Sequence, residues 1–430
     1  MAVEVVEEVG ATSVPTSSRV PRFFEPLRQR DFALLWTARS ISLVGDQFYF
    51  LALAWLTLQL TGSALALGGV LMAAAIPRGA LMLAGGAITD RFSPRHLMIA
   101  SDVTRTALVG AVGILALTGQ VQLWHLYALA AMFGAIDAVF YPCASAFVPL
   151  LVPEERLPAA TALSEVSNRG SVLVGPGVAG LVIAIAGGMF GTGIAFMADA
   201  ASFLLSAAAL LFIRARTPRG GGAADEETAQ PGFFRSIREG LRYAWRDPVI
   251  RYSLLIVAGI DVTLNGAFGV GLPLLARNQF SGGAAALGAL DTGFGAGAVL
   301  GIIIAGSIAT PRRRGLLIVG ITAGFGVGTL LMPFMPNLPI AAAWMGAMAI
   351  GSGLANVLLM PWLQARTDPA MMGRVMSLFM FASFGLTPLS YAASGWIASV
   401  STTLLFVSGG AIIFATASFA LLNRTIRTID

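Results

Sequence analysis

Apolar stretches long enough to cross a lipid bilayer recur along almost the whole chain, from Asp31 to Asn423. About 20 apolar residues span the hydrocarbon core as a helix, and only helices suit that depth because unpaired backbone groups are costly there. Turn residues such as Thr61-Gly62-Ser63 separate the stretches. The pattern therefore predicts an all-α polytopic membrane protein with twelve transmembrane helices, near residues 33–59, 65–89, 97–118, 124–149, 160–186, 192–213, 249–276, 286–309, 315–335, 339–361, 375–399 and 402–423.

The composition excludes a water-soluble protein of this length. Charged residues make up 11% of the 430 residues, against about 25% in soluble domains. The net charge of +5 does not indicate a nucleic-acid partner, because the basic residues, all of them arginine, are spread over the segments between the apolar stretches. The single cysteine, Cys143, lies in an apolar stretch and allows no intrachain disulfide. We expect no cofactor and no metal.

The arginines predict the orientation in the membrane. If the amino terminus is cytoplasmic, 22 of the 27 arginines fall in cytoplasmic segments and the outer turns hold none, with Arg277 only at the edge of a span. Such a bias follows the positive-inside rule. We therefore expect a multi-pass protein of the bacterial cytoplasmic (inner) membrane with both termini in the cytoplasm.

Features recur at half the chain length and predict an internal repeat. Asp46 and Asp261 lie 215 residues apart, and Gly175-Pro176 is echoed by Gly385 and Pro388. Two six-helix halves are typical of transporters whose binding cavity lies between the repeats. The expected organisation is a cytosolic tail (1–30), a six-helix bundle (31–213), a cytoplasmic linker with an amphipathic helix (214–247), a second six-helix bundle (248–423) and a cytosolic tail (424–430).

Ionisable residues inside predicted spans are the main functional candidates. An aspartate at a helix centre costs about 2.5–3.5 kcal/mol on insertion scales, so a functional reason is expected. The candidates for proton coupling or substrate binding are Asp46, Asp137, Asp261, Asp199 and Arg78. A carboxyl group for which a cationic substrate and a proton compete would couple the two movements. The alternative is a static buried pair with an arginine.

Some of these ionisable residues also have a purely structural interpretation. We expect Asp46 to be the partner of Arg78, and a hydrogen bond with Ser202 is the structural account of Asp199. Glu165 and Arg169 are four residues apart, which favours a structural ion pair on one helix face.

Several motifs resemble those of a known transporter family. Gly86-Ala87-Ile88-Thr89-Asp90-Arg91 followed by Arg95 is similar to the loop signature of the major facilitator superfamily, with Ser93 and Pro94 replacing its usual residues. Gly175-Pro176-Gly177-Val178-Ala179-Gly180 resembles the superfamily's antiporter motif, with Ala179 replacing a glycine. Further segments, including Val148–Pro153 and Asp199–Phe203, resemble the drug–proton antiporter branch, which includes macrolide efflux pumps and the enterobactin exporter.

The resemblance implies roles for two groups of residues. It implies a gate in which Asp90 docks against the start of the eleventh helix, and Asp102 and Arg105 either extend that network or form an ordinary pair. The gating candidates are Gly86, Asp90, Arg91, Arg95, Asp102, Arg105, Gly373 and Arg374. It also implies that Gly175, Pro176 and Gly180 form a bend that seals the cavity against ion leak.

The expected function is a secondary active transporter that exports an amphiphilic small molecule, a drug or secondary metabolite, in exchange for protons by alternating access. The alternatives are a siderophore exporter or a lysophospholipid or lipid flippase of the same fold. A membrane-embedded enzyme is remote, because the two histidines, His96 and His125, are near span ends on opposite sides. The expected partners are the substrate, protons and membrane lipids, with no nucleic acid, and the chain is expected to act as a monomer.

Overall fold

A computed structural model describes residues 22–91, 93–214, 242, 245, 248–307, 314–367 and 371–422. Within these ranges the secondary structure is entirely helical and contains no strand. The predicted amphipathic helix of the linker and both predicted tails fall largely outside the described residues. The predicted domain boundaries therefore stay a prediction.

The amino-terminal half consists of six long helices and three short ones. Its long helices follow the predicted spans in order, and each begins slightly before the predicted start. The elements are η1 (Arg22–Arg28), α1 (Arg30–Thr61), α2 (Ala64–Arg91), α3 (Pro94–Leu117), α4 (Leu123–Phe147), η2 (Val148–Leu150), η3 (Glu154–Arg156), α5 (Leu157–Ala186) and α6 (Gly188–Phe212).

The carboxy-terminal half differs because two of its membrane-crossing segments change helix type midway. A π-helical segment, η4 (Leu264–Gly271), joins α8 (Pro248–Thr263) to α9 (Leu272–Asn278). A second, η6 (Phe381–Gly385), joins α13 (Met372–Met380) to α14 (Thr387–Val400) across Leu386. The remaining elements are α10 (Ala284–Ser307), α11 (Arg314–Leu331), η5 (Met332–Phe334), α12 (Leu338–Arg366) and α15 (Thr402–Leu422).

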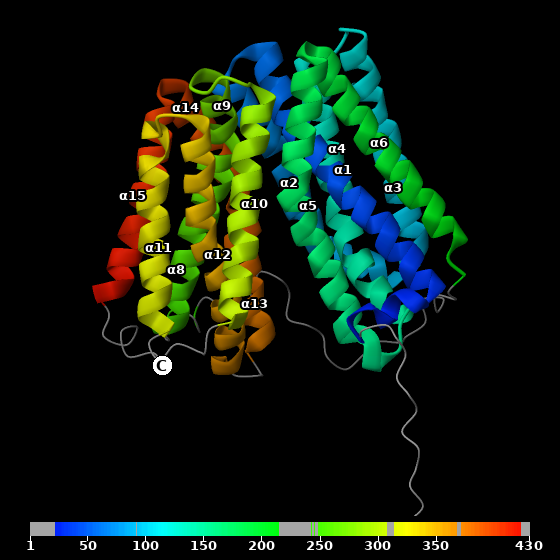
Figure 1. Ribbon diagram of the computed structural model, residues 1–430. Coiled ribbons are helices and arrows are strands. Elements are labelled where there is room, and N and C mark those ends of the chain that lie inside the picture. Colours follow the sequence, from blue (N-terminus) through cyan, green and yellow to red (C-terminus); the bar gives the residue numbers. More distant parts are fainter. Residues whose placement is uncertain are drawn as a thin grey trace, which may run out of the picture.

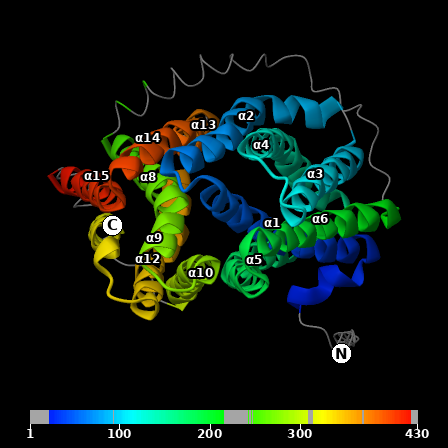
Figure 2. The same ribbon diagram turned by 90° about the horizontal axis from the view of Figure 1, so that it is seen from above.

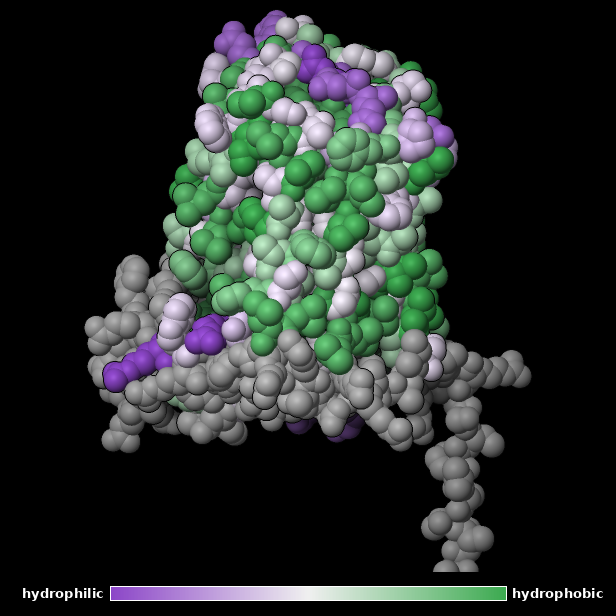
Figure 3. Space-filling view, turned by 90° about the vertical axis from the view of Figure 1, so that its left-hand side faces the viewer, coloured by the Kyte–Doolittle hydropathy of each residue, from purple (hydrophilic) through white to green (hydrophobic). Residues whose placement is uncertain are grey.

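The fold confirms the predicted polytopic membrane protein. In the described part of the chain, eleven helical segments are long and apolar enough to cross a membrane. The one predicted span not among these eleven, the eleventh at 375–399, is the composite segment α13–η6–α14. Figure 3 shows a broad hydrophobic band on the outer face of the carboxy-terminal half, with hydrophilic residues toward its two ends. Exposed side chains such as Leu389 and Trp396 belong to such a lipid-facing surface.

The helices form two bundles, α1–α6 and α8–α15, which stand side by side (Figure 1). Residues 22 and 422 lie at the same end, here called the terminal end, and the opposite end is called the distal end. In Figure 2, α5 faces α10 and α2 faces α14 across the boundary between the bundles. Figure 1 shows α5 and α10 close together toward the distal end and diverging toward the terminal end.

Glycines allow the close approach at the distal end. A Cβ placed on Gly180 of α5 would lie 2.5 Å from the Ala284 carbonyl oxygen of α10. A Cβ on Gly68 of α2 would lie 2.6 Å from the Tyr391 carbonyl oxygen of α14. Small residues let helix backbones pack closely in membranes. The two halves are therefore held backbone to backbone in their distal parts.

Candidate functional site

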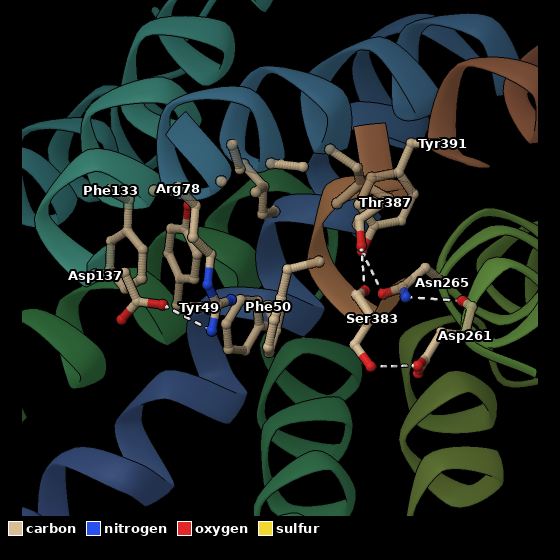
Figure 4. A pocket seen from close by; sticks show the side chains of 17 residues that line it. Tyr49, Phe50, Arg78, Phe133, Asp137, Asp261, Asn265, Ser383, Thr387 and Tyr391 are labelled. Carbon is tan, nitrogen blue, oxygen red and sulfur yellow. Dashed lines mark hydrogen bonds and ion pairs between the residues drawn. The ribbon is translucent and has the colours of Figure 1, made fainter. Parts of the chain in front are cut away.

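A cavity of about 370 Å³ lies between the two bundles (Figure 4). Residues of α1, α2 and α4 form one wall, and residues of α8, η4, η6 and α14 form the other. Ligand sites in proteins are mostly apolar with a few convergent polar groups, and this cavity has that character. Its lining residues are Tyr49, Phe50, Leu53, Leu71, Ala74, Ala75, Arg78, Gly79, Phe133, Gly134, Asp137, Asp261, Asn265, Ser383, Phe384, Thr387 and Tyr391.

On the amino-terminal wall, Asp137 is held by two arginines. Arg105 Nη2 donates a hydrogen bond of 2.7 Å to Asp137 Oδ1, and Arg78 Nη2 lies 3.3 Å from Asp137 Oδ2. The prediction that Asp46 pairs with Arg78 was wrong. The reason is that α2 packs against α4, which places Asp137 rather than Asp46 beside the Arg78 guanidinium. Asp137 is therefore a neutralised carboxylate at the cavity surface.

Arg105 is almost completely buried, with a side chain only 1% exposed. Its guanidinium carbon lies 4.9 Å from the centre of the Phe133 ring, 4.5 Å from Phe140 and 5.3 Å from Phe203. A guanidinium is weakly hydrated and interacts favourably with aromatic faces, which suits it to a buried ion pair. The aromatic surroundings hold Arg105 behind the wall, where it pairs with Asp137.

On the carboxy-terminal wall, Asp261 has no ion-pair partner among the described residues. Its Oδ2 accepts a hydrogen bond of 2.7 Å from Ser383 Oγ. Asn265 Nδ2 donates to the Asp261 carbonyl oxygen at 2.8 Å, and Tyr391 Oη donates to Asn265 Oδ1 at 3.4 Å. In Figure 4 these polar groups face the Arg78–Asp137 pair across the cavity. Asp261 is therefore a carboxyl group with neutral neighbours, facing a cavity.

Three further aspartates lie inside the amino-terminal bundle and do not line the cavity. Asp102 and Asp199 are fully buried and accept hydrogen bonds from Ser206 (2.7 Å) and Ser202 (3.3 Å). The expected hydrogen bond between Asp199 and Ser202 is present, and a role of Asp199 in proton coupling stays a prediction. Asp46 Oδ1 is buried without a hydrogen-bond partner.

These aspartates belong to one electrostatic cluster. Asp46 interacts with Arg105, Asp137, Asp102 and Arg39, and Asp199 interacts with Asp46. Isolated charges are costly in a low-dielectric interior, so such a cluster favours overall neutrality. The members are four carboxyl groups and three arginines: Asp46, Asp102, Asp137, Asp199, Arg39, Arg78 and Arg105. One bound proton makes this cluster neutral.

The predicted gate lies on helix ends whose backbone is described, but several of its side chains are not described. Gly86, Asp90 and Arg91 belong to the end of α2, and Gly373 and Arg374 to the start of α13. The side chains of Asp90, Arg91 and Arg374 are among those not described. The predicted docking of Asp90 stays a prediction.

The structure gives the other gating candidates definite partners. Arg95 donates hydrogen bonds of 2.9 Å to the carbonyl oxygens of Leu210 and Leu211, which cap the end of α6. Asp102 and Arg105 hydrogen-bond to Ser206 and Asp137 respectively rather than to each other. The described contacts of these three residues lie within the amino-terminal half.

The antiporter-motif residues lie at helix contacts in α5. A Cβ on Gly175 would come within 2.5 Å of the Gln47 side chain of α1, whereas Gly180 faces α10 across the boundary between the halves. The Pro176 carbonyl oxygen lies 2.3 Å from a Cβ placed on Gly288 of α10. Sealing against ion leak stays a prediction, but the motif forms the tight distal contact between the halves.

Sequence reasoning missed part of the carboxy-terminal wall. Ser383, Thr387 and Tyr391 recur every four residues, which is the signature of a polar stripe on one helix face. That spacing in an apolar span was the signal available. Among the aromatic residues, Tyr49 lines the cavity and stacks on Phe133 with 3.9 Å between ring centroids.

Solved transporter structures share the fold. The chain superposes on a bacterial homologue of the iron transporter ferroportin in an inward-facing state with a TM-score of 0.69, at 13% identity, covering 91% of this chain and 98% of that one. It superposes on a peptide transporter, POT, with a TM-score of 0.70, at 13% identity, covering 93% of this chain and 95% of that one. These likenesses show that the chain has the fold of known membrane transporters.

Sequence relatives include efflux proteins. The chain is 22% identical over 406 residues to macrolide efflux protein A of Streptococcus pyogenes, covering 93% of this chain and 97% of that protein. It is 27% identical over 372 residues to the multidrug efflux pump Tap of Mycolicibacterium fortuitum, covering 83% and 86%. Residues 22–430 match the family of transmembrane secretion effectors, and the chain belongs to that family. The resemblance to the major facilitator superfamily is thereby confirmed.

Proposed function

We propose that this protein exports an amphiphilic cation in exchange for protons, and that the two compete for Asp261. The observation that carries the proposal is a carboxyl group that faces a cavity between two transporter halves without a cationic partner in the described chain. A bound cation would provide the charge that Asp261 lacks. A proton would neutralise the same group in the empty cavity, so the two occupants exclude each other.

The other groups of the cavity suit an amphiphilic substrate. Tyr49, Phe50, Phe133 and Phe384 provide apolar surface, and Asn265 and Tyr391 provide neutral hydrogen-bonding groups. Asp137 is already neutralised by Arg78 and Arg105, so it does not compete strongly for a cation. The cluster around Asp46 is one proton short of neutrality and is a second place at which a coupling proton would be held.

The efflux relatives and the arginines support the direction of transport. Macrolide efflux protein A and Tap are efflux proteins by name. Arginines at helix ends, such as Arg95 and Arg156, lie at the terminal end in the described chain, with Arg277 at the distal end. By the positive-inside rule this distribution supports a cytoplasmic terminal end, in the bacterial inner membrane. Alternating access would then rock the two halves about the cavity.

The test is substrate flux in proteoliposomes with an imposed proton gradient, using a macrolide that carries a dimethylamino group. We expect Asp261→Asn to reduce gradient-driven flux by about tenfold or more, because a neutral amide can neither bind a proton nor attract a cation. The matched control is Asp291→Asn in α10, which removes an intramembrane carboxyl group that does not line the cavity. Equal flux in wild type and Asp261→Asn would contradict the proposal.

The same assay distinguishes export of an amphiphilic cation from the two alternatives that the sequence leaves open, a siderophore exporter and a lipid flippase. Transport of a lysophospholipid, or of an anionic siderophore that requires Arg78 but not Asp261, would replace the amphiphilic cation as substrate. Substrate flux in the wild-type protein that does not depend on the proton gradient would contradict antiport itself.

A further inference from the structure

A second cavity of about 320 Å³ lies beside the first and is lined by apolar side chains. It is formed between α2 on one side and α13, η6 and α14 on the other. None of its lining side chains is titratable or carries a hydrogen-bonding hydroxyl or amide group. They are Ala75, Ile76, Gly79, Ala80, Met82, Met380, Phe381, Phe384, Gly385 and Pro388.

The two cavities are separated by a thin line of contact. Ala75, Gly79 and Phe384 line both of them. On α2, Arg78 belongs only to the central cavity, whereas Ile76 and Ala80 belong only to the apolar one. Because successive helix residues turn by about 100°, these residues point to opposite sides of the line through positions 75 and 79. The apolar cavity therefore lies behind the central one.

The apolar cavity opens on the lipid-facing rim of the molecule. Figure 2 shows α2 and α13 at the rim. Ile76, Met380 and Phe381 are 51%, 54% and 45% exposed, which suits contact with lipid chains in a protein of this class. The cavity lies in the part of α2 nearer the terminal end, so it meets the leaflet on that side.

The contact between α2 and the eleventh span loosens at this level. Near the distal end, a Cβ on Gly68 would meet the Gly395 Cα at 2.9 Å. At the apolar cavity, a Cβ on Gly79 would find only the Phe384 carbonyl oxygen, at 4.0 Å. The facing segment is the π-helical η6, and π-helical turns are frequent at functional sites. The looser helix contact at Gly79 and the π-helical backbone of η6 therefore lie at the same level of the molecule.

Phe384 separates the two cavities and is in contact with a charge. The Arg78 guanidinium carbon lies 5.6 Å from the centre of the Phe384 ring, and the same guanidinium pairs with Asp137. Arg78 thereby links the amino-terminal wall to the aromatic ring on the opposite half. An organic cation that carries an apolar group could replace this contact with its own charge on the same ring.

We propose that the apolar cavity is a lateral portal through which the apolar part of the substrate passes from the membrane leaflet into the central cavity, with Phe384 as its movable partition. The proposal rests on the proposed function for the nature of the substrate, an amphiphilic cation. The occupant is a hydrocarbon chain or ring that arrives from the bilayer. The adjacency of the two cavities, which share Ala75, Gly79 and Phe384 as lining residues, carries the proposal.

The experiment follows access to the central cavity, and it needs no transport. Thr387→Cys places a thiol in the central cavity of the full-length protein in liposomes. Its labelling rate is measured with a bilayer-partitioned dodecyl maleimide and with a water-soluble sulfonated maleimide. Protein without the Thr387 change gives the background from Cys143, which is buried. Proton-driven flux is not part of this readout, so failure of the portal and failure of proton antiport are distinguishable.

Two variants are expected to change the labelling rate of the dodecyl reagent in opposite directions. We expect Ala80→Trp, which fills the portal only, to slow the dodecyl reagent by about tenfold and leave the soluble reagent unchanged, because a bulky side chain occludes a cavity of this size. Phe384→Ala should accelerate the dodecyl reagent. Leu81→Trp is the control, since Leu81 is exposed on the same helix but lines neither cavity.

The outcome that overturns the proposal is equally specific. If Ala80→Trp and Leu81→Trp have the same effect on the dodecyl reagent, or if both reagents slow together in Ala80→Trp, the substrate route does not pass between α2 and η6. Access would then run through the aqueous opening of the central cavity.

Discussion

The two halves of this transporter handle buried charge in different ways. The amino-terminal half gathers four carboxyl groups and three arginines into one cluster, in which Asp137 is held by Arg78 and Arg105. In the carboxy-terminal half, Asp261 faces the cavity and accepts a hydrogen bond from Ser383. It has no arginine partner among the described residues. The fixed cluster suits structure and charge balance, whereas the accessible carboxyl suits exchange of ligands.

The backbones differ in the same sense. Helices α1 and α2 run unbroken past the cavity, although α2 contains Pro77. The cavity-lining segments of the other half contain two π-helical segments, η4, which follows Asp261, and η6, which includes Ser383. Additional residues in a helical turn leave room for local rearrangement. The comparison indicates a rigid amino-terminal wall and an adaptable carboxy-terminal wall.

The largest expected effect follows from breaking the fixed cluster. Arg105→Ala removes a buried cation from Asp137 and should lower stability by about 3 kcal/mol or more, because it leaves uncompensated buried charge. Thermal unfolding in detergent measures the effect. Arg169→Ala is the control, since the Arg169–Glu165 pair is largely exposed and is expected to contribute less than about 1 kcal/mol. A similar loss in both variants would contradict the distinction.

An intermediate effect is expected at the distal contact between the halves. Gly180→Val places a branched side chain against the backbone of α10, where space is absent, and should cost about 1–3 kcal/mol of packing. Trp55 of α1 lies against Gly283, directly before α10, since a Cβ on Gly283 would be 3.1 Å from its ring. The halves should separate there and expose a cysteine introduced at Trp55 to soluble maleimide. Gly170→Val in the same helix is the control, because nothing lies within 4 Å of a Cβ at that position. Unchanged labelling in Gly180→Val would show that this contact does not hold the distal end closed.

The smallest expected effect concerns one hydrogen bond between the halves. Arg277 of α9 donates through Nη1 to the Leu58 carbonyl oxygen of α1. Arg277→Gln should shift the balance toward an open distal end by about 1 kcal/mol, the typical net contribution of such a bond. The rate of labelling at Trp55→Cys measures the shift. A shift as large as that of Gly180→Val would mean that the hydrogen bond, not the helix packing, closes this end.

The amino-acid sequence predicted the helices and the two halves better than it predicted which residue lies beside each charged side chain. Hydrophobic length fixed the spans, and the 215-residue offset related Asp46 to Asp261. The offset sets the height of a residue along its helix but not the neighbour that it faces. The structure places Asp261 at the cavity and Asp46 behind the opposite wall. Likewise, the Arg78–Asp137 pair depends on the packing of α2 against α4, which a single sequence does not specify.

The most direct test of the account is proton release on ligand binding. A macrolide carrying a dimethylamino group is added to purified protein in weakly buffered detergent solution, and the pH change is recorded with the amount bound. The account predicts that wild-type protein releases protons on binding and that Asp261→Asn releases none. Equal release from both proteins, or binding to wild type without release, would contradict the claim that substrate and proton compete for Asp261.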